Sequence, residues 1–169
     1  MAAIPLETPS FATIPAFRVA GLRENYTPAT AHEIPLLWTR FAPHIGHVPF
    51  QFDNAAYGLV YNMHGTNGFD YVAGVAVIPG NPRDPMDGLP AEFVSIEVPQ
   101  LYCVVFPHRE HVSRLKDTIG AVFQEWLPAS GKALAGFAAG VPGCIEYYGP
   151  DFDPATGCGE MDLRVPIQA

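Results

Sequence analysis

The sequence contains two stretches that follow one plan, and this repetition constrains the fold more than any other feature. Each stretch reads as a strand, a helix ending in an aromatic-rich turn, and then two further strands. The first copy runs from about Pro15 to Ile78 and the second from about Phe93 to Ile167. Two such halves can pack about a pseudo-twofold axis, and the seam between them is a natural cleft for a ligand.

The length and the turn signals predict one domain. A chain of 169 residues is large enough to bury a core of its own. The segment Pro79–Pro90 holds four prolines and two glycines in twelve residues, which is typical of a joint between halves that is too short to separate independent domains. We expect a loose N-terminal arm at residues 1–13 and a single ligand-binding domain at residues 14–169.

The charge balance argues against several classes of partner. The net charge is −8 without a Lys/Arg cluster, so the sequence does not predict direct nucleic-acid binding. The first fifteen residues show neither the basic n-region nor the continuous apolar stretch typical of a signal peptide, and no apolar run is long enough to span a bilayer. Its three cysteines do not form a disulfide framework and indicate a reducing compartment. We therefore expect a cytoplasmic protein without membrane contact.

Helical periodicity appears once in each half. Ile34, Leu37, Trp38 and Phe41 share one helical face, which predicts a helix over about Ala31–Ala42 with Pro35 in its first turn. A second apolar stripe runs from Val112 to Trp126, with stop signals at Pro128 and Gly131. Strands are expected at the following segments: Ala16–Asn25, Tyr57–Tyr61, Phe69–Ile78, Phe93–Val98, Leu101–Phe106, Cys144–Tyr148 and Glu160–Ile167. The connection Asn62–Gly68 is expected to close a hairpin, and Gly74 indicates a bulge or a close backbone approach.

Glu146 is the residue to which the pattern gives most weight. It lies in the apolar, aromatic strand Cys144–Tyr148, with Tyr148 on its own face and Tyr147 on the other. A carboxylate in such a strand is costly unless it is paired. The residues leave two interpretations: a solvated or structurally bonded glutamate, or a buried acid that recognises a cation or acts as a general acid/base.

The remaining candidate residues are weaker. Aromatic side chains are spread over both halves, and the pattern does not separate core rings from rings that face the seam. The pairs His44/His47 and His108/His111 lie at helix ends without a Cys/His quartet, so neither a metal site nor a cofactor is predicted.

The order and spacing of these segments resemble the GyrI-like small-molecule-binding domain, which is also the effector-binding module of multidrug-sensing transcription activators. The resemblance covers nearly everything after Pro15 and rests on the following segments: Ile34–Phe41, Tyr57–Tyr61, Phe69–Val75, Phe93–Phe106, Phe123–Pro128, Ile145–Tyr148 and Glu160–Ile167. It implies an α+β fold in which two β-α-β-β units form a curved antiparallel sheet, with two main helices on one side and a central groove. Such regulators carry an added helix-turn-helix segment, so the resemblance here is to a stand-alone form.

The resemblance also implies site residues, because family members carry an acidic residue at the position of Glu146. The ligand-binding set that it implies here is Glu146, Trp38, Tyr57, Tyr61, Tyr71, Trp126 and Tyr148. The favoured function is capture or sensing of a lipophilic, aromatic and commonly cationic small molecule. The alternative is a hydrolase that adds water to a strained electrophile such as a cyclopropane-containing toxin, with Glu146 and Tyr71 as catalytic residues. A third hypothesis is a gyrase-inhibitor-like protein that acts on a protein partner, which no residue specifically supports.

Overall fold

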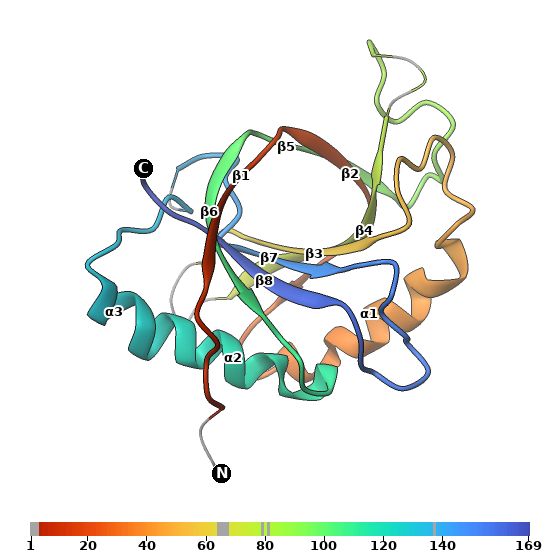
Figure 1. Ribbon diagram of the computed structural model, residues 1–169. Helices are drawn as coiled ribbons and strands as arrows, with labels where there is room; N and C mark the ends of the chain where they lie inside the picture. The colour runs from red at the N-terminus through yellow and green to blue at the C-terminus, as the bar shows by residue number, and fades with distance from the viewer. Residues whose placement is uncertain (1–3, 64–67, 79, 81, 137) are drawn as a thin grey trace.

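The computed structural model describes residues 4–63, 68–78, 80, 82–136 and 138–169. These residues form one eight-stranded antiparallel sheet with the helices on one of its sides (Figure 1). The sheet curls away from the helices, so that β1 and β6 at one end and β2 and β5 at the other rise above its centre. This is the curved α+β architecture expected from the repeat and the resemblance.

The strands and helices follow the predicted order closely. The strands are β1 (Ser10–Ile14), β2 (Phe17–Tyr26), β3 (Ala56–Tyr61), β4 (Phe69–Val77), β5 (Val94–Val98), β6 (Leu101–Pro107), β7 (Cys144–Tyr148) and β8 (Met161–Pro166). The helical elements are η1 (Ala31–Glu33), α1 (Ile34–Phe41), η2 (Ala42–His44), η4 (Val112–Arg114), α2 (Leu115–Ala121), the π-helical turn η5 (Val122–Trp126) and α3 (Leu127–Ser130). Residues 64–67 of the expected hairpin connection, and residues 79 and 81 of the expected joint, lie outside the described residues.

The sheet order confirms the internal repeat. The strands lie in the order β1-β6-β8-β7-β3-β4-β2-β5. The first half contributes β3-β4-β2 and the second contributes β7-β8-β6, so the two triplets are mirrored about the central β3–β7 pair. Ala56 pairs with Tyr148 and Val60 with Cys144 across this seam. The halves are therefore joined by backbone hydrogen bonds as well as by side-chain packing.

Each half also has an additional strand that pairs with the opposite half. Strand β1 immediately precedes the first half but pairs with β6, and β5 opens the second half but pairs with β2. The expectation of a loose arm at residues 1–13 is therefore wrong for residues 10–13, which belong to β1. The physical reason is that β6 needs a partner for its outer backbone groups, and residues 10–14 supply one.

Side chains alternate between the two faces of the sheet and form two cores. On the helix-bearing face, Leu37 and Phe41 of α1 pack with Val75 of β4 and Phe106 of β6. The opposite face has its own buried cluster, which includes Val19, Leu59, Val72, Cys103 and Ile145. Because a strand presents successive residues to opposite faces, the register decides which side chains can meet over the helices.

Proline and glycine residues explain where the helices begin and end. Pro35 lies in the first turn of α1, where its missing N–H is not needed. The second helix runs past Trp126 to Ser130, and Gly131 ends it with a left-handed φ of 72°. Helix continues across Pro128 because η5 widens the helix upstream of it, where the amide of Leu127 donates to the carbonyl of Val122.

A substitution at Gly74 tests whether strands β2 and β4 can accommodate a side chain where their backbones pack closely. It pairs regularly with Gly21, and a Cβ there would lie 2.6 Å from the carbonyl oxygen of Ala20. We expect Gly74→Ala to lower the free energy of unfolding by about 1–3 kcal/mol, as overpacking does, in denaturant titrations. Gly120→Ala is the control, because its Cβ meets nothing within 4 Å and alanine favours helix. Equal stability of the two variants would contradict this account.

Candidate ligand-binding site

Glu146 lies on the central strand pair of the sheet, at the seam between the two halves. It pairs with Gly58 across β3 and β7, and with Leu163 of β8 on the other side. Its carboxylate is on the helix-bearing face, and only 8% of the residue is exposed. The interpretation of Glu146 as a solvated surface residue is therefore excluded.

A short chain of hydrogen bonds holds this carboxylate through one oxygen. Tyr71 Oη donates to Glu146 Oε1 at 2.7 Å, and Tyr148 Oη donates to the same atom at 2.8 Å. Trp38 Nε1 of helix α1 donates to Tyr71 Oη at 2.8 Å. The chain links an α1 side chain and a β4 side chain of the first half to β7 of the second half.

The rings of this chain enclose the carboxylate. The Trp38 ring packs edge-on against Tyr148 at 5.3 Å and Tyr71 at 6.5 Å between centroids. Phe152, in the loop after β7, packs against Tyr148 at 5.0 Å. Tyr71 and Tyr148 are buried, whereas Trp38 and Phe152 are half-buried. Such rings suit flat or cationic ligands, since their faces are electron-rich.

Burial controls the ionisation of the site. Desolvation raises the pKa of Glu146 above its ordinary value, and the hydrogen bonds from Tyr71 and Tyr148 oppose this only in part. Burial also raises the pKa of both tyrosines, which the nearby carboxylate reinforces. None of the ion pairs between described residues includes Glu146. The carboxylate therefore lacks a positive partner among the residues that the structure describes.

The structure brings some of the expected ligand-binding residues together and separates others. Glu146, Trp38, Tyr71 and Tyr148 form one cluster. Tyr57 and Tyr61 are on the opposite face of β3, within the second core. Tyr57 donates a hydrogen bond to Asp53, and the Tyr61 hydroxyl is buried without a partner among the described residues.

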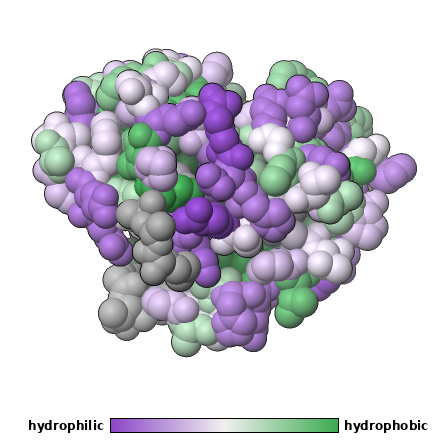
Figure 2. Space-filling model, turned by 60° about the horizontal axis from the view of Figure 1, so that its bottom comes forward, coloured by the Kyte–Doolittle hydropathy of each residue, from purple (hydrophilic) through white to green (hydrophobic). Residues whose placement is uncertain are grey.

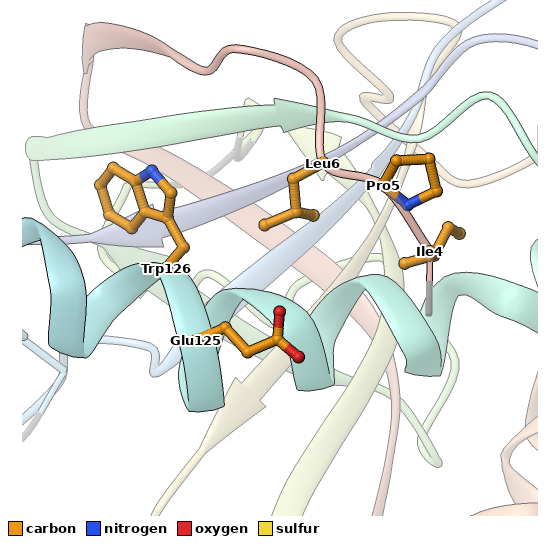
Figure 3. Close-up of a pocket in the computed structure, with 5 residues that line it drawn as sticks. All are labelled: Ile4, Pro5, Leu6, Glu125 and Trp126. Carbon is orange, nitrogen blue, oxygen red and sulfur yellow. The ribbon is translucent and has the colours of Figure 1, made fainter. Parts of the chain in front are cut away.

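Trp126 lies apart from this cluster and lines a cavity on the helix-bearing side. Its ring packs edge-on against Phe106 at 5.0 Å. A pocket of about 490 Å³ lies between this tryptophan, Glu125 and the N-terminal segment at residues 4–6. In Figure 3 the Leu6 side chain points toward Trp126, and the Glu125 carboxylate extends from the helix toward the N-terminal segment.

Neither of the two described cavities is lined by Glu146. The second, of about 370 Å³, lies near the ends of β2 and β4 beside Phe52 and Ile78. Figure 2 brings the helix-bearing side forward and shows hydrophilic side chains across its middle, between smaller hydrophobic areas. The central groove implied by the resemblance thus stays a prediction.

Two residues of the site were missed by the sequence analysis. Gly58 lies opposite Glu146, and a Cβ there would collide with Tyr71 Oη and come within 2.8 Å of Glu146 Oε1. An isolated glycine inside a strand is a known signal of close approach, and it was available in the Tyr-Gly-Leu-Val-Tyr segment. Phe152 gave no comparable signal, because a loop ring has no periodicity to place it.

His108 contributes to local structure. His108 is buried, with Nδ1 2.8 Å from Thr118 Oγ1 and Nε2 3.0 Å from the carbonyl oxygen of His111. The carbonyl can only accept, so Nε2 carries the hydrogen. The described part of the chain contains no group of three or more His, Cys, Asp or Glu side chains arranged to hold a metal ion.

The curled, two-fold repeated sheet described above is the fold of a family of ligand-binding domains. The family model of the GyrI-like small molecule binding domain matches residues 7–168. The chain belongs to this family, and it is a small-molecule-binding domain. A search of curated proteins found no matching relative.

Solved structures share the fold at low sequence identity. The structure of SAV2435 bound to tetraphenylphosphonium is 15% identical, with a TM-score of 0.72 over 96% of this chain and 95% of that one. EcmrR in a DNA complex is 14% identical, with a TM-score of 0.64 over 95% of this chain but only 57% of its own. A hydrolase from Listeria innocua is 12% identical, with a TM-score of 0.55 over 98% of this chain and 94% of that one.

The comparisons and the helices bear on the expected partners. EcmrR shows that a domain of this fold occurs within a DNA-bound protein, so the expected absence of direct nucleic-acid contact stays a prediction. Of the helices in the described ranges, none is both long and apolar enough to cross a bilayer.

The raised pKa of Glu146 predicts how stability depends on pH. Between the unfolded and the raised folded pKa, the folded state holds a proton that the unfolded state has lost, so stability falls as pH rises. Glu146→Gln cannot titrate, and the difference in unfolding free energy, wild type minus variant, should decrease by at most about 1.4 kcal/mol per pH unit in this window. Denaturant titrations of both proteins over a pH series measure it. A pH-independent difference would contradict the raised pKa.

Proposed function

We propose that this domain captures a lipophilic, aromatic small molecule that carries positive charge, and that Glu146 is its anchor. The observation that carries the proposal is a buried carboxylate that is held by two tyrosine hydroxyls and has no ion pair with any described residue. An ionised group in such a place costs free energy that two neutral donors only partly offset. A cationic ligand supplies the missing charge.

The surrounding rings support the same class of ligand. Trp38, Tyr71 and Tyr148 place aromatic rings around the carboxylate. A delocalised cation gains from these ring faces and needs few directional hydrogen bonds. Trp38 and Phe152 are the half-buried members of the cluster, so a ligand would reach Glu146 beside them. Tetraphenylphosphonium, which is bound in the SAV2435 structure, is a probe of this class.

A second candidate is hydrolysis of a strained electrophile, and the raised pKa of Glu146 favours it. A carboxyl group whose pKa is raised holds its proton more strongly and can serve as a general acid or base. Tyr71, however, already donates its one hydroxyl hydrogen to Glu146, so that hydrogen is not free for a leaving oxygen in this arrangement. Incubating the protein with a cyclopropane-containing alkylating compound and looking for the water adduct by mass spectrometry distinguishes turnover from capture.

Binding of tetraphenylphosphonium tests the anchor directly. We expect Glu146→Gln to weaken binding at least about tenfold above the glutamate pKa, because the variant loses the Coulombic attraction between carboxylate and cation, which is on the order of 1–4 kcal/mol near a protein surface. Isothermal titration calorimetry or quenching of tryptophan fluorescence measures the affinity. Unchanged affinity in Glu146→Gln would remove Glu146 from the site and reject the proposal.

Two tyrosine variants that each lose one hydroxyl give a matched pair. Tyr71→Phe removes a donor to the carboxylate, which destabilises the ionised form, and should weaken tetraphenylphosphonium binding about tenfold near neutral pH. Tyr61→Phe loses a hydroxyl that lies on the opposite face of the sheet without a partner among the described residues, and should leave the affinity unchanged. Equal losses in the two variants would argue against a site over Tyr71.

A further inference from the structure

We propose that Glu146 admits two chemical classes of ligand through a single atom, Oε2. When the carboxyl group is ionised, Oε2 faces a lipophilic cation. When it is protonated, Oε2–H donates a hydrogen bond to a neutral aromatic compound with a strong acceptor, such as a phosphine oxide, sulfoxide or amide. This inference rests on the proposed function, because it concerns the same site and adds a second ligand class to it.

The first step is that Oε1 is committed to the protein. An indole nitrogen can only donate, so the bond from Trp38 Nε1 makes Tyr71 Oη an acceptor at 2.8 Å. The hydroxyl hydrogen of Tyr71 is thereby left for Glu146 Oε1 at 2.7 Å, and Tyr148 donates to the same oxygen at 2.8 Å. Two donors occupy both lone pairs of Oε1, so a proton added to the carboxyl group resides on Oε2.

The second step is that Oε2 can be reached. It takes no hydrogen bond from any described residue, since both bonds to Glu146 end on Oε1. Among the described residues, Tyr61 Oη is the one side-chain nitrogen or oxygen atom that is fully enclosed and has no hydrogen-bond partner. Oε2 is not such an atom, so it keeps some exposed surface, in agreement with the 8% exposure of the residue. The atom that gains or loses the proton is therefore the one available to a ligand.

The third step is that Glu146 alone sets the charge of the site. The groups around it come from every neighbouring element: Trp38 of α1, Gly58 of β3, Tyr71 of β4, Cys144 and Tyr148 of β7, and Leu163 of β8. The titratable ones are Tyr71, Tyr148 and Cys144, and burial raises the pKa of all three, so they stay neutral while Glu146 titrates. Helix α2 adds only apolar contacts to Tyr148, through Leu115 and Ile119.

The experiment compares two probes of nearly the same shape. Tetraphenylphosphonium is a cation without a hydrogen-bonding group, and triphenylphosphine oxide is neutral with one strong acceptor. Affinities are measured by calorimetry from about pH 5 to pH 9, a range that spans documented values for buried glutamates. Below the Glu146 pKa the cation should bind about tenfold more weakly for each pH unit lost, and above it the oxide should weaken by about the same factor per unit gained. Both curves should bend at the same pH.

Glu146→Gln separates the two ligand classes. Its amide oxygen can accept from Tyr71 and Tyr148 as Oε1 does, and its NH₂ group donates where Oε2–H would. The variant should therefore bind triphenylphosphine oxide at every pH, within about threefold of the wild-type affinity at low pH, a difference below 1 kcal/mol. It should bind the cation at least about tenfold more weakly than ionised wild type. Glu125→Gln, which neutralises an exposed carboxylate at the cavity beside Trp126, should change neither affinity.

The outcomes separate this inference from the proposed function. Wild-type oxide affinity that does not change with pH, or a loss of oxide binding in Glu146→Gln, overturns the second ligand class while cation capture stands. Cation binding that is unaffected by Glu146→Gln rejects both proposals. A loss of cation binding in Glu125→Gln places the cation in the cavity beside Trp126 (Figure 3) and likewise rejects both.

Discussion

The central constraint on this structure is the burial of one carboxyl group at the seam between the two repeated halves of the sheet. Glu146 is placed there by β7, and Tyr148 of the same strand donates one hydrogen bond to it. The other groups that make its burial tolerable come from the other half: the hydroxyl of Tyr71, the indole of Trp38 and the space left by Gly58. Buried polar groups are costly when only partly satisfied. One carboxyl oxygen is satisfied fully and the other is not, and this asymmetry gives the site its chemical character.

The pairing of each edge strand with the opposite half explains why the two halves stay together although the site lies between them. Each half lends its first strand to the other, β1 to β6 and β5 to β2, while β3 and β7 pair at the centre. The two-residue links Pro15–Ala16 and Pro99–Gln100 carry the chain from one end of the curled sheet to the other. Separating the halves would break three sets of backbone hydrogen bonds, so ligand entry is easier beside the half-buried rings than by opening the seam.

Much of this arrangement could be predicted from local pattern. Helical spacing located α1, the position of Pro35 fixed its first turn, and alternation put Tyr148 on the face of Glu146. Alternation could not say which face of β3 meets that side. Tyr57 and Tyr61 belong to the opposite face because Gly58 is the residue that pairs with Glu146. Register depends on hydrogen bonds between strands that are far apart in sequence, and a shift of one residue would have reversed the assignment.

The same limit applies to elements that are stabilised only by distant partners. Residues 10–14 have little periodicity of their own and become a strand because β6 offers an unpaired edge. Trp126 falls on a clear helical stripe, yet whether it faces the seam or the N-terminal segment follows from the path of residues 4–6, which no local pattern encodes. Glu146 was identifiable for the opposite reason: an acid in an apolar strand conflicts with its own surroundings. A residue that conflicts with its local sequence in this way is a typical signal of a functional site. The side chains that satisfy it can be identified only once the pairing of the strands is known.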